Sequence, residues 1–439
     1  MKTIKPKFQF VLLLISIIYG KFILNAQTTS TDFKEIEGKV VDDKTNDPLI
    51  FTDLVINNSN ISTVTNSDGE FLLKIPEAFL NAKLTISRLG YEKKEIPISS
   101  LENNTKIRLL PALTELSVVE IETYKDAKEL LKATLKNKSS AYNNENTLMT
   151  AFYRETIKKR RKNASLSEAV VQIHKRPYNS FRRDGIELVK SRKNTDYDKL
   201  DTLALKLQGG PFSNLYTDII KYPEYIFSDE DIDLYDFSFD KSTQINNNMV
   251  YVINFKQKPN IVIKSPLNLG TVTTISTANT PPMYYGKLYI DSESLALTSA
   301  VYSLNVENKE LSSQMYIRKK PRKVDVYPTE ANYRVNYRTQ NGKWHYAYSN
   351  IALTFKVNWK GKLFNSVYTL NSEMAITDWE INDTKYAKVR ENVIRPTTVM
   401  IDEASGFSDP EFWGEYNIIE PEKSIESAIK KIQRQLRRT

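Results

Sequence analysis

The chain contains no cysteine and only two histidines among its 439 residues. The missing cysteines exclude disulfide bonds, thiol catalysis, cysteine-ligated zinc and a lipidated N-terminal cysteine. The histidines are not spaced as zinc ligands, because Pro177 lies three residues after His174 and Tyr348 lies three residues after His345. Thiol enzymes and zinc peptidases are therefore not among the candidate classes.

Motifs of several other enzyme classes are also missing. The sequence has no Gly-x-Ser-x-Gly nucleophile elbow, no phosphate-binding glycine-rich loop and no dinucleotide fingerprint. A pair of catalytic acids leaves no local pattern, so a carboxylate-based hydrolase stays open as an alternative. We predict a protein that is not an enzyme and that holds no cofactor.

The acidic run Asp229, Asp231 and Asp233, with Asp240 beyond it, imitates part of a calcium-binding loop. Leu234 occupies the position where such a loop needs glycine for its turn, and the bidentate glutamate is missing. We interpret this run as a solvated acidic loop and predict no metal site.

Long apolar stretches are scarce as well. The apolar run from Phe8 to Tyr19 is shorter than the roughly 20 residues that a membrane-spanning helix needs. Three lysines precede it, and Leu24-Asn25-Ala26 precedes Gln27, the pattern of a secretory signal peptide with its cleavage site. Residues 1–26 are therefore predicted to be a signal peptide, with an uncleaved anchor as the alternative, and the protein is predicted to be exported.

Aromatic residues are abundant, with 25 Tyr and 18 Phe beside only 13 Gly, a composition that favours long, regular strands. The formal net charge is +9. Much of the excess lies in the signal peptide, in Lys158-Lys159-Arg160-Arg161-Lys162 and in the last ten residues. Because no nucleic-acid-binding motif accompanies these residues, we predict solvated turns and a basic tail, and no nucleic-acid partner.

Residues 35–111 alternate short apolar runs with turn residues, a pattern typical of a small antiparallel β-sandwich. Asp68-Gly69 supplies the positive φ angles of a tight hairpin turn. Phe71–Ile75 follow as a strand, which Pro76 ends. The residues that carry a resemblance to a known domain family are Gly38-Lys39-Val40-Val41-Asp42, Pro48, Asn66, Ser67-Asp68-Gly69-Glu70-Phe71 and Leu89-Gly90-Tyr91. By these residues the stretch resembles the carboxypeptidase-regulatory-like domain, a transthyretin-like sandwich of many exported Gram-negative proteins. The resemblance implies a module that accompanies zinc carboxypeptidases and is not their catalytic part.

Residues 112–146 are predicted to be a connector, with an added strand at Leu116–Ile121 and an amphipathic helix at Asp126–Lys138. Because this connector is polar and rich in Lys and Asn, we expect few contacts between the sandwich and the region that follows.

Residues 147–406 are predicted to form one large β domain. From Thr147 to Glu380 apolar residues mostly alternate with polar ones, which predicts a large, curved antiparallel sheet or half-barrel with a few helices. Asn341-Gly342 and Lys360-Gly361-Lys362 are predicted hairpin turns. Leu311–Ile317 is predicted to be a strand, and Pro259–Thr280 a long loop. Leu215–Ile220 is predicted to be a short helix. The chain is thus mostly β.

The large region, together with the sandwich, resembles exported bacterial proteins that join the regulatory-like domain to a β domain of unknown function. The motifs that carry this resemblance are Ala151-Phe152-Tyr153-Arg154-Glu155, Ser167–Val171, Ser191-Arg192-Lys193, Gly209-Gly210-Pro211, Tyr285–Asp291 and Phe412-Trp413 with Tyr416–Ile419. The Gly286–Asp291 strand is also similar to strands of LolA-like lipoprotein carriers, whose sheets curl around an apolar cavity.

Charged residues occur within these predicted strands, and inward-facing ones would need partners because an isolated buried charge is very costly. Our candidate polar cluster consists of Arg154, Glu155, Glu168, His174, Arg192 and Asp196. A structural ion-pair network or simple solvent-facing alternation is the favoured interpretation, with a binding site as the alternative.

Residues 407–439 contain an aromatic group, Phe412, Trp413 and Tyr416, followed by a helix with Ile425, Ile429, Ile432 and Leu436 on one face. We predict that this segment folds back and closes the large β domain. The alternative is peripheral association of the helix with the membrane.

The sequence as a whole predicts a non-enzymatic binding or scaffolding protein of the periplasm or outer membrane. Its partner would be an envelope component: a protein, a glycan or a lipid. The alternatives are a LolA-like lipid or lipoprotein carrier and a carboxylate-based hydrolase. A deep apolar cavity would favour the carrier, two inward carboxyls roughly 5–10 Å apart in a cleft the hydrolase, and a filled interior scaffolding.

Overall fold

The structure is a computed structural model. It describes residues 33–112, 124–160, 162–195, 210–240, 243–245, 248–264, 272–276, 282–317, 322–361, 365–382, 392–398, 400–406, 412–423 and 425. The predicted signal peptide, the predicted strand at Leu116–Ile121 and the predicted C-terminal helix beyond Ile425 lie outside these residues.

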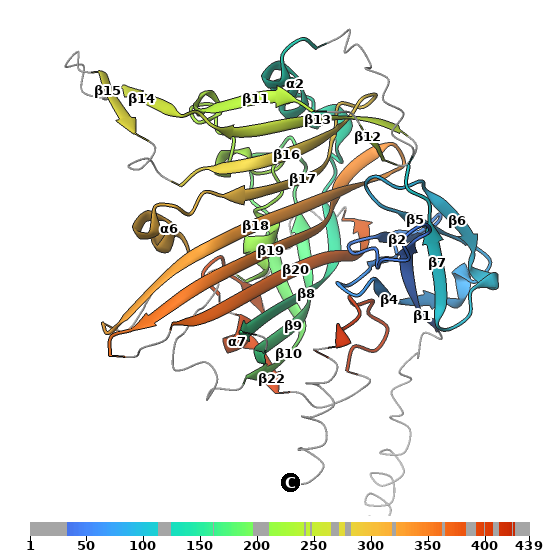
Figure 1. Cartoon of the computed structure of the whole chain (residues 1–439). Helices are drawn as coiled ribbons and strands as arrows, with labels where there is room; N and C mark the ends of the chain where they lie inside the picture. The colour runs from blue at the N-terminus through green and yellow to red at the C-terminus, as the bar shows by residue number, and fades with distance from the viewer. Residues whose placement is uncertain are drawn as a thin grey trace, which may run out of the picture.

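The N-terminal region is a two-sheet sandwich, as predicted (Figure 1). One sheet has the order β4-β1-β7, formed by β4 (Glu70–Pro76), β1 (Phe33–Asp42) and β7 (Thr105–Leu109). The other has the order β3-β2-β5-β6, formed by β3 (Ser62–Val64), β2 (Asp53–Ile56), β5 (Lys83–Ser87) and β6 (Lys94–Pro97). The short helices η1 (Glu77–Phe79) and η2 (Ile98–Ser100) join strands. Side chains such as Ile36, Leu54 and Leu73 fill the space between the sheets.

The Asp68-Gly69 turn connects the two sheets of the sandwich, so the predicted hairpin is wrong. β3, before the turn, pairs with β2, whereas β4, after it, pairs with β1. Gly69 has a φ of +74°, and a Cβ there would lie 2.8 Å from the carbonyl oxygen of Val40. This close approach requires glycine at the crossing.

The large region is an open sheet of 13 strands, which confirms the predicted fold class. Its order is β11-β13-β16-β17-β18-β19-β20-β8-β9-β10-β21, with β12 beside β13 and β22 beside β10. The bounds are β8 Thr147–Lys159, β9 Lys162–Lys175, β10 Gly185–Thr195, β11 Tyr235–Phe239, β12 Thr243–Ile245, β13 Asn248–Gln257, β16 Tyr284–Asp291, β17 Leu297–Leu304, β18 Val324–Gln340, β19 Lys343–Trp359, β20 Ser366–Ile381, β21 Val393–Ile394 and β22 Ser405–Gly406. Figure 1 shows that the sheet is strongly curved.

Local predictions within this region had mixed outcomes. The hairpin at Asn341-Gly342 is confirmed, since both residues have positive φ and join the antiparallel pair β18–β19. The predicted strand at Leu311–Ile317 is wrong, because helix α6 (Lys309–Tyr316) begins there with Asn308 as its N-cap. The predicted long loop at Pro259–Thr280 is also wrong, since it contains the hairpin of β14 (Asn260–Lys264) and β15 (Val272–Ser276).

One face of the large sheet, which we call the core face, is covered by helices and turns of the same chain. α2 (Ala127–Lys136), α3 (Lys138–Ala141), α5 (Pro211–Leu215), η3 (Pro223–Tyr225) and η4 (Ile232–Leu234) contribute the cover. The short helix predicted at Leu215–Ile220 is displaced, because α5 ends at Leu215 and turns follow it. The cover and the sheet share one continuous apolar core.

The opposite face, which we call the sandwich face, packs against the N-terminal sandwich and against residues 412–420 (Figure 1). Phe51 of the sandwich lies 5.2 Å, ring to ring, from Tyr348 of the sheet. The Ser62 hydroxyl donates to the carbonyl of Ile376 at 2.9 Å. The expectation of few contacts between sandwich and sheet is therefore wrong. The polar connector composition did not predict this interface, because the contacts come from other segments.

No helix among the described residues is both long enough and apolar enough to cross a bilayer.

Candidate functional site

Strand register brings three of the predicted cluster residues into one row on the sandwich face. Arg154 on β8 lies opposite Glu168 on β9, which lies opposite Arg192 on β10. The Glu168 carboxylate accepts from Arg154 Nε and from Arg192 Nε, each at 2.7 Å. Burial disfavours the Glu168 charge, but the two guanidinium groups outweigh it and lower the pKa of this carboxyl. The row is thus a buried, charge-paired network.

A fourth member, Glu373 on β20, was missed by the sequence analysis. It lies opposite Arg154 in the sheet register and contacts its guanidinium at 3.4 Å. Burial is the main cause that raises the pKa of Glu373. Only the strand pairing, which the sequence does not specify over more than 200 residues, could have revealed this partner.

Residues 412–420 cover this network on the sandwich face of the sheet. The Arg154 guanidinium donates to the carbonyls of Ile419 at 2.6 Å and Glu420 at 3.2 Å. The Trp413 ring lies 4.8 Å from the Arg192 guanidinium carbon. Through Arg154 and Arg192 the network therefore holds a segment of the protein's own chain, an arrangement suited to stabilising the fold.

The remaining predicted cluster residues lie elsewhere. Glu155 points to the core face, where it accepts from the Tyr153 hydroxyl at 2.8 Å, and burial raises its pKa to about 7. His174 contacts Glu187 at 3.4 Å and lies six residues from Glu168 along β9, about 20 Å away. Asp196 is outside the described residues. The six predicted residues thus do not form one site.

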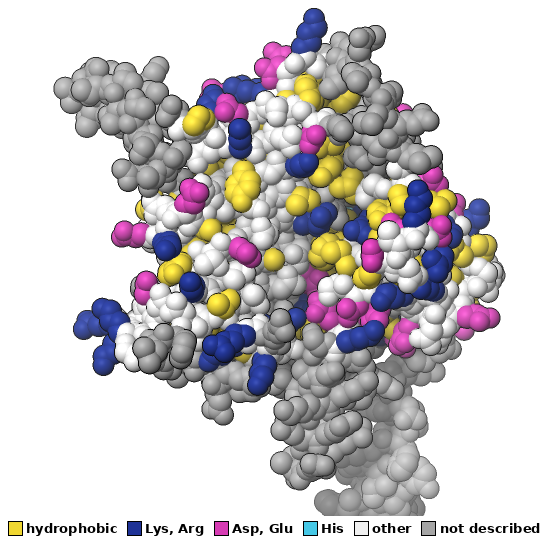
Figure 2. All heavy atoms as spheres, viewed as in Figure 1, with side chains coloured by type: hydrophobic (Ala, Val, Ile, Leu, Met, Phe, Trp, Pro, Cys, Tyr) yellow, Lys and Arg dark blue, Asp and Glu magenta, His cyan; other side chains and the backbone are white. Residues whose placement is uncertain are grey.

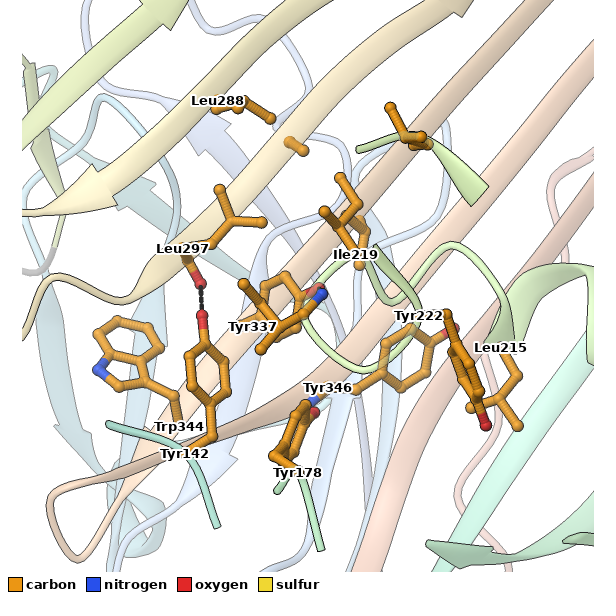
Figure 3. Close-up of a cluster of buried hydrophobic side chains, with 14 of the residues drawn as sticks. Tyr142, Tyr178, Leu215, Ile219, Tyr222, Leu288, Leu297, Tyr337, Trp344 and Tyr346 are labelled. Carbon is orange, nitrogen blue, oxygen red and sulfur yellow. Dashed lines mark hydrogen bonds between the residues drawn. The ribbon is translucent and has the colours of Figure 1, made fainter. Parts of the chain in front are cut away.

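A second buried network, also missed by the sequence analysis, lies within the core. The Lys175 ammonium contacts Asp184 at 2.8 Å and Asp218 at 2.7 Å. Burial opposes its charge, but these two carboxylates outweigh that effect and raise the pKa of Lys175. Rings of Tyr178, Tyr222 and Tyr346 lie within 6 Å of this ammonium. Figure 3 shows these tyrosines among the packed side chains of the core.

An open pocket of about 190 Å³ lies on the core face, between α6, the α5–η3 segment and the sheet. We call it the tyrosine pocket; its lining residues are Ser213, Tyr216, Thr217, Tyr225, Ile226, Tyr284, Tyr302, Met315, Tyr316, Tyr333 and Ile351. The rings of Tyr302 and Tyr333 are stacked with centroids 5.1 Å apart. Tyr225 and Met315 are 40% and 44% exposed, so partner groups can reach them.

The lining of the tyrosine pocket determines which contacts it can make. Its lining side chains are aromatic, aliphatic or hydroxyl-bearing, with no carboxylate, imidazole or amine among them. Burial raises the pKa of Tyr284 to about 12, so this hydroxyl stays protonated at neutral pH. Such a surface offers stacking and hydroxyl hydrogen bonds, but no general base for the neutral pH range.

Two carboxylates of the acidic run, those of Asp231 and Asp233, contact other side chains of the protein. The Asp233 carboxylate contacts the Lys128 ammonium at 2.5 Å, and this hydrogen bond lowers the pKa of Asp233. Asp231 accepts from the Ser228 hydroxyl at 2.8 Å. Within the described part of the chain, no group of three or more acidic or histidine side chains is arranged to hold a metal ion.

Comparison with known proteins supports the resemblance of the N-terminal module. Residues 36–121 match the family model of the CarboxypepD_reg-like domain, which assigns this part of the chain to that domain family. No curated protein is significantly similar to the chain. Among solved structures, the crystal structure of MucB in complex with MucA(peri) is weakly similar. It is 8% identical, covers 59% of this chain and 100% of its own, and has a TM-score of 0.16.

Proposed function

We propose that this chain is a non-enzymatic binding protein of the bacterial cell envelope, and that the tyrosine pocket receives a group of its partner. The observation that carries the proposal is the composition of this pocket, which combines six Tyr, two Ile and one Met with the hydroxyl groups of Ser213 and Thr217, and has no titrating acid or base near pH 7. Aromatic residues and Met are enriched in the buried centres of protein interfaces.

The geometry disfavours the carrier alternative. The core face that would have to enclose a lipid is covered by α5, η4 and the turns between them. The tyrosine pocket on this face has a volume of about 190 Å³, which is smaller than the roughly 300–1,000 Å³ of pockets that enclose a drug-sized ligand. A filled interior with a small open pocket favours recognition of a partner's surface group.

The hydrolase alternative is disfavoured by the placement of the acids. Glu168 and Glu373 both contact Arg154, beneath the backbone of Ile419 and Glu420. Glu155 lies on the other face of the sheet, bonded to Tyr153. A glycosidase-type pair needs two carboxyls that flank a substrate in a cleft, and these acids flank protein.

Location in the envelope is supported by the signal-like N-terminus and by the domain family of residues 36–121. Protein recovered from an envelope fraction should therefore begin at or near Gln27 by N-terminal sequencing. Recovery of an intact Met1 would contradict cleavage.

The binding claim is tested by blocking the pocket at its rim. Met315→Trp should fill the mouth, whereas Met315→Leu conserves volume and serves as the control. Affinity capture from envelope extract should recover one discrete partner with the wild type and Met315→Leu, and lose it with Met315→Trp. Unchanged capture by a Met315→Trp protein of normal melting temperature would refute the pocket as the binding site.

A further inference from the structure

Lys175, the last residue of β9, carries a primary amine into the core of the protein. Its side chain is 2% exposed, and the side chains of its two partners, Asp184 and Asp218, are fully buried. Lysine is rarely buried to this extent, and Figure 2 shows Lys and Arg side chains exposed across the visible face of the molecule. The core thus holds an amine and two carboxyl groups in contact with one another and shielded from bulk water.

Strand register places Asp184 opposite Lys175. Gly185, the first residue of β10, pairs with His174, so the residue before Gly185 faces the residue after His174. The Lys175 Nζ lies 2.8 Å from Asp184 Oδ2 and 2.7 Å from Asp218 Oδ2. One amine therefore contacts two carboxyl groups, one from the start of the neighbouring strand and one from the segment after α5.

The hydrogen bonds of Asp184 suit a carboxyl group that is attacked by an amine. Its Oδ1 accepts from the backbone N–H of Arg176 at 2.7 Å, a fixed donor that stabilises negative charge developing on this oxygen. Its Oδ2 accepts from the Tyr222 hydroxyl at 2.7 Å, so a donor lies at the oxygen that would leave. The Tyr222 oxygen in turn accepts from the backbone N–H of Asp184 at 3.1 Å, which fixes this hydroxyl in place.

Asp218 is placed to carry protons. Its Oδ2 accepts from Lys175 Nζ, while its Oδ1 accepts from the Tyr337 hydroxyl at 2.9 Å and from the backbone N–H of Lys221 at 3.2 Å. These two further donors stabilise the Asp218 carboxylate when Lys175 loses its charge. A carboxylate in hydrogen-bond contact with a nucleophile has the geometry of a general base.

We propose that Lys175 and Asp184 condense to an isopeptide bond, with Asp218 as the proton carrier and no other reactant. Lys175 first passes a proton to Asp184, which converts the ion pair into an amine and a carboxylic acid. The amine nitrogen attacks Cγ of Asp184, forming the N–C bond, and gives a second proton to Asp218. Asp218 returns this proton to the departing hydroxyl group, the Cγ–Oδ2 bond breaks, and water leaves. The three hydrogens of the ammonium thus become one amide hydrogen and two hydrogens of the water, with charge conserved.

Burial and fixed contact favour this condensation. Burial opposes the Lys175 charge, but the two carboxylates raise its pKa, so the free amine is a minor form before the reaction. Proximity compensates, because groups held in reactive contact can reach effective concentrations of about 10⁵–10⁸ M. The reaction also replaces two buried charges, each costly in the interior, by one neutral amide. The product joins the end of β9 covalently to the start of β10.

The test is mass spectrometry of the mature wild-type chain under denaturing conditions. We expect a mass lower than that calculated from the sequence by one water molecule. In a tryptic digest, tandem spectra should show a branched peptide that joins Lys175 to Asp184, with no cleavage after Lys175. A wild type of full calculated mass would overturn the proposal, as would a loss of water that maps to another site.

Three variants assign the roles. Lys175→Arg keeps the positive charge but not the nucleophilic amine, so it should have its full calculated mass. Lys128→Arg, at a lysine that contacts Asp233 outside this network, is the matched control and should lose one water as the wild type does. Asp218→Asn should leave most of the chain uncondensed, and complete condensation in this variant would overturn the role of Asp218.

These results do not depend on the capture experiment above. Neither Lys175 nor its two partners line the tyrosine pocket. The mass of the wild type is also informative whether or not a variant folds.

Discussion

Two buried titratable residues of the large sheet respond to pH in opposite directions. The Glu155 carboxyl has a pKa of about 7 in the folded protein against an ordinary value of 4.5, because burial disfavours its charge. His345 has a pKa of about 3 against 6.5, because burial and the nearby charge of Arg338 disfavour its protonation. Both shifts destabilise the folded state in the pH range where the unfolded chain carries the charge.

Glu155→Gln should therefore stabilise the protein above pH 7. Between pH 4.5 and 7 the folded state binds more protons at this site than the unfolded state, so the wild type loses stability as pH rises through that window. At about 1.4 kcal/mol per pKa unit, the variant should gain about 3 kcal/mol at pH 8 and almost nothing at pH 4.5. Chemical denaturation at both pH values checks this. A variant less stable at pH 8 would show that Glu155 is ionised and paired.

His345→Gln should change stability on the acid side. Between pH 3 and 6.5 the unfolded chain binds the proton that buried His345 excludes, so wild-type stability rises with pH across this window. The variant lacks this titration, and its stability should fall less, by about 3 kcal/mol, between pH 7 and pH 4.5. Equal acid sensitivity of the variant and the wild type in denaturant titrations would contradict the depressed pKa.

At the scale of elements, residues 412–420 act as a layer between the sandwich and the large sheet. Trp413 packs edge-on against Phe152 of β8, with ring centroids 5.3 Å apart. Asn417 accepts from the backbone of Lys74 at 2.7 Å and donates to its carbonyl at 3.1 Å. Thr63 of β3 donates to the carbonyl of Ile418 at 3.0 Å. Both β units thus contribute to holding this segment.

Removal of the Trp413 ring should be strongly destabilising. Trp413→Ala deletes a buried aromatic side chain and leaves a cavity, at a cost of about 3–5 kcal/mol in the free energy of unfolding. Glu415→Ala, at an exposed position of the same segment, is the control and should change little. Urea denaturation of both variants measures the difference. A cost below about 1 kcal/mol for Trp413→Ala would mean that this segment does not pack as described.

Whether the sequence predicted a feature depended on whether the interactions that determine it are local or join distant segments of the chain. Asn341-Gly342 and the helix that begins after Asp126 are determined by local turn and capping chemistry, and the structure contains both. The strand predicted at Leu311–Ile317 failed because its apolar residues resemble a strand, whereas the Asn308 cap starts a helix. Arg154, Glu168 and Arg192 were singled out as charges within strands, but Glu373 required the register of β20 against β8.

At the scale of the whole molecule, the tie between sandwich and sheet predicts joint unfolding. Asp53 of β2 and Arg338 of β18 form a two-pronged ion pair across the interface, and Phe51 packs on Tyr348 nearby. The wild type should therefore melt in one calorimetric transition. Asp53→Ala leaves Arg338 largely buried without its partner, which typically costs about 3–5 kcal/mol. Glu37→Ala, at an exposed position of the sandwich, is the control. Two well-separated transitions in the wild type would show that the interface contributes little.

The central claim is that the tyrosine pocket is where this protein contacts a partner in the envelope. The most direct measurement places a photo-crosslinking amino acid at Tyr225, on the exposed rim of the pocket, and irradiates intact cells. The same amino acid at Leu110, which is 48% exposed on the sandwich, is the matched control. The proposal predicts one discrete adduct from position 225 that is absent from position 110 and is lost when Met315→Trp is added. No adduct at position 225, or the same adduct from both positions, would contradict it.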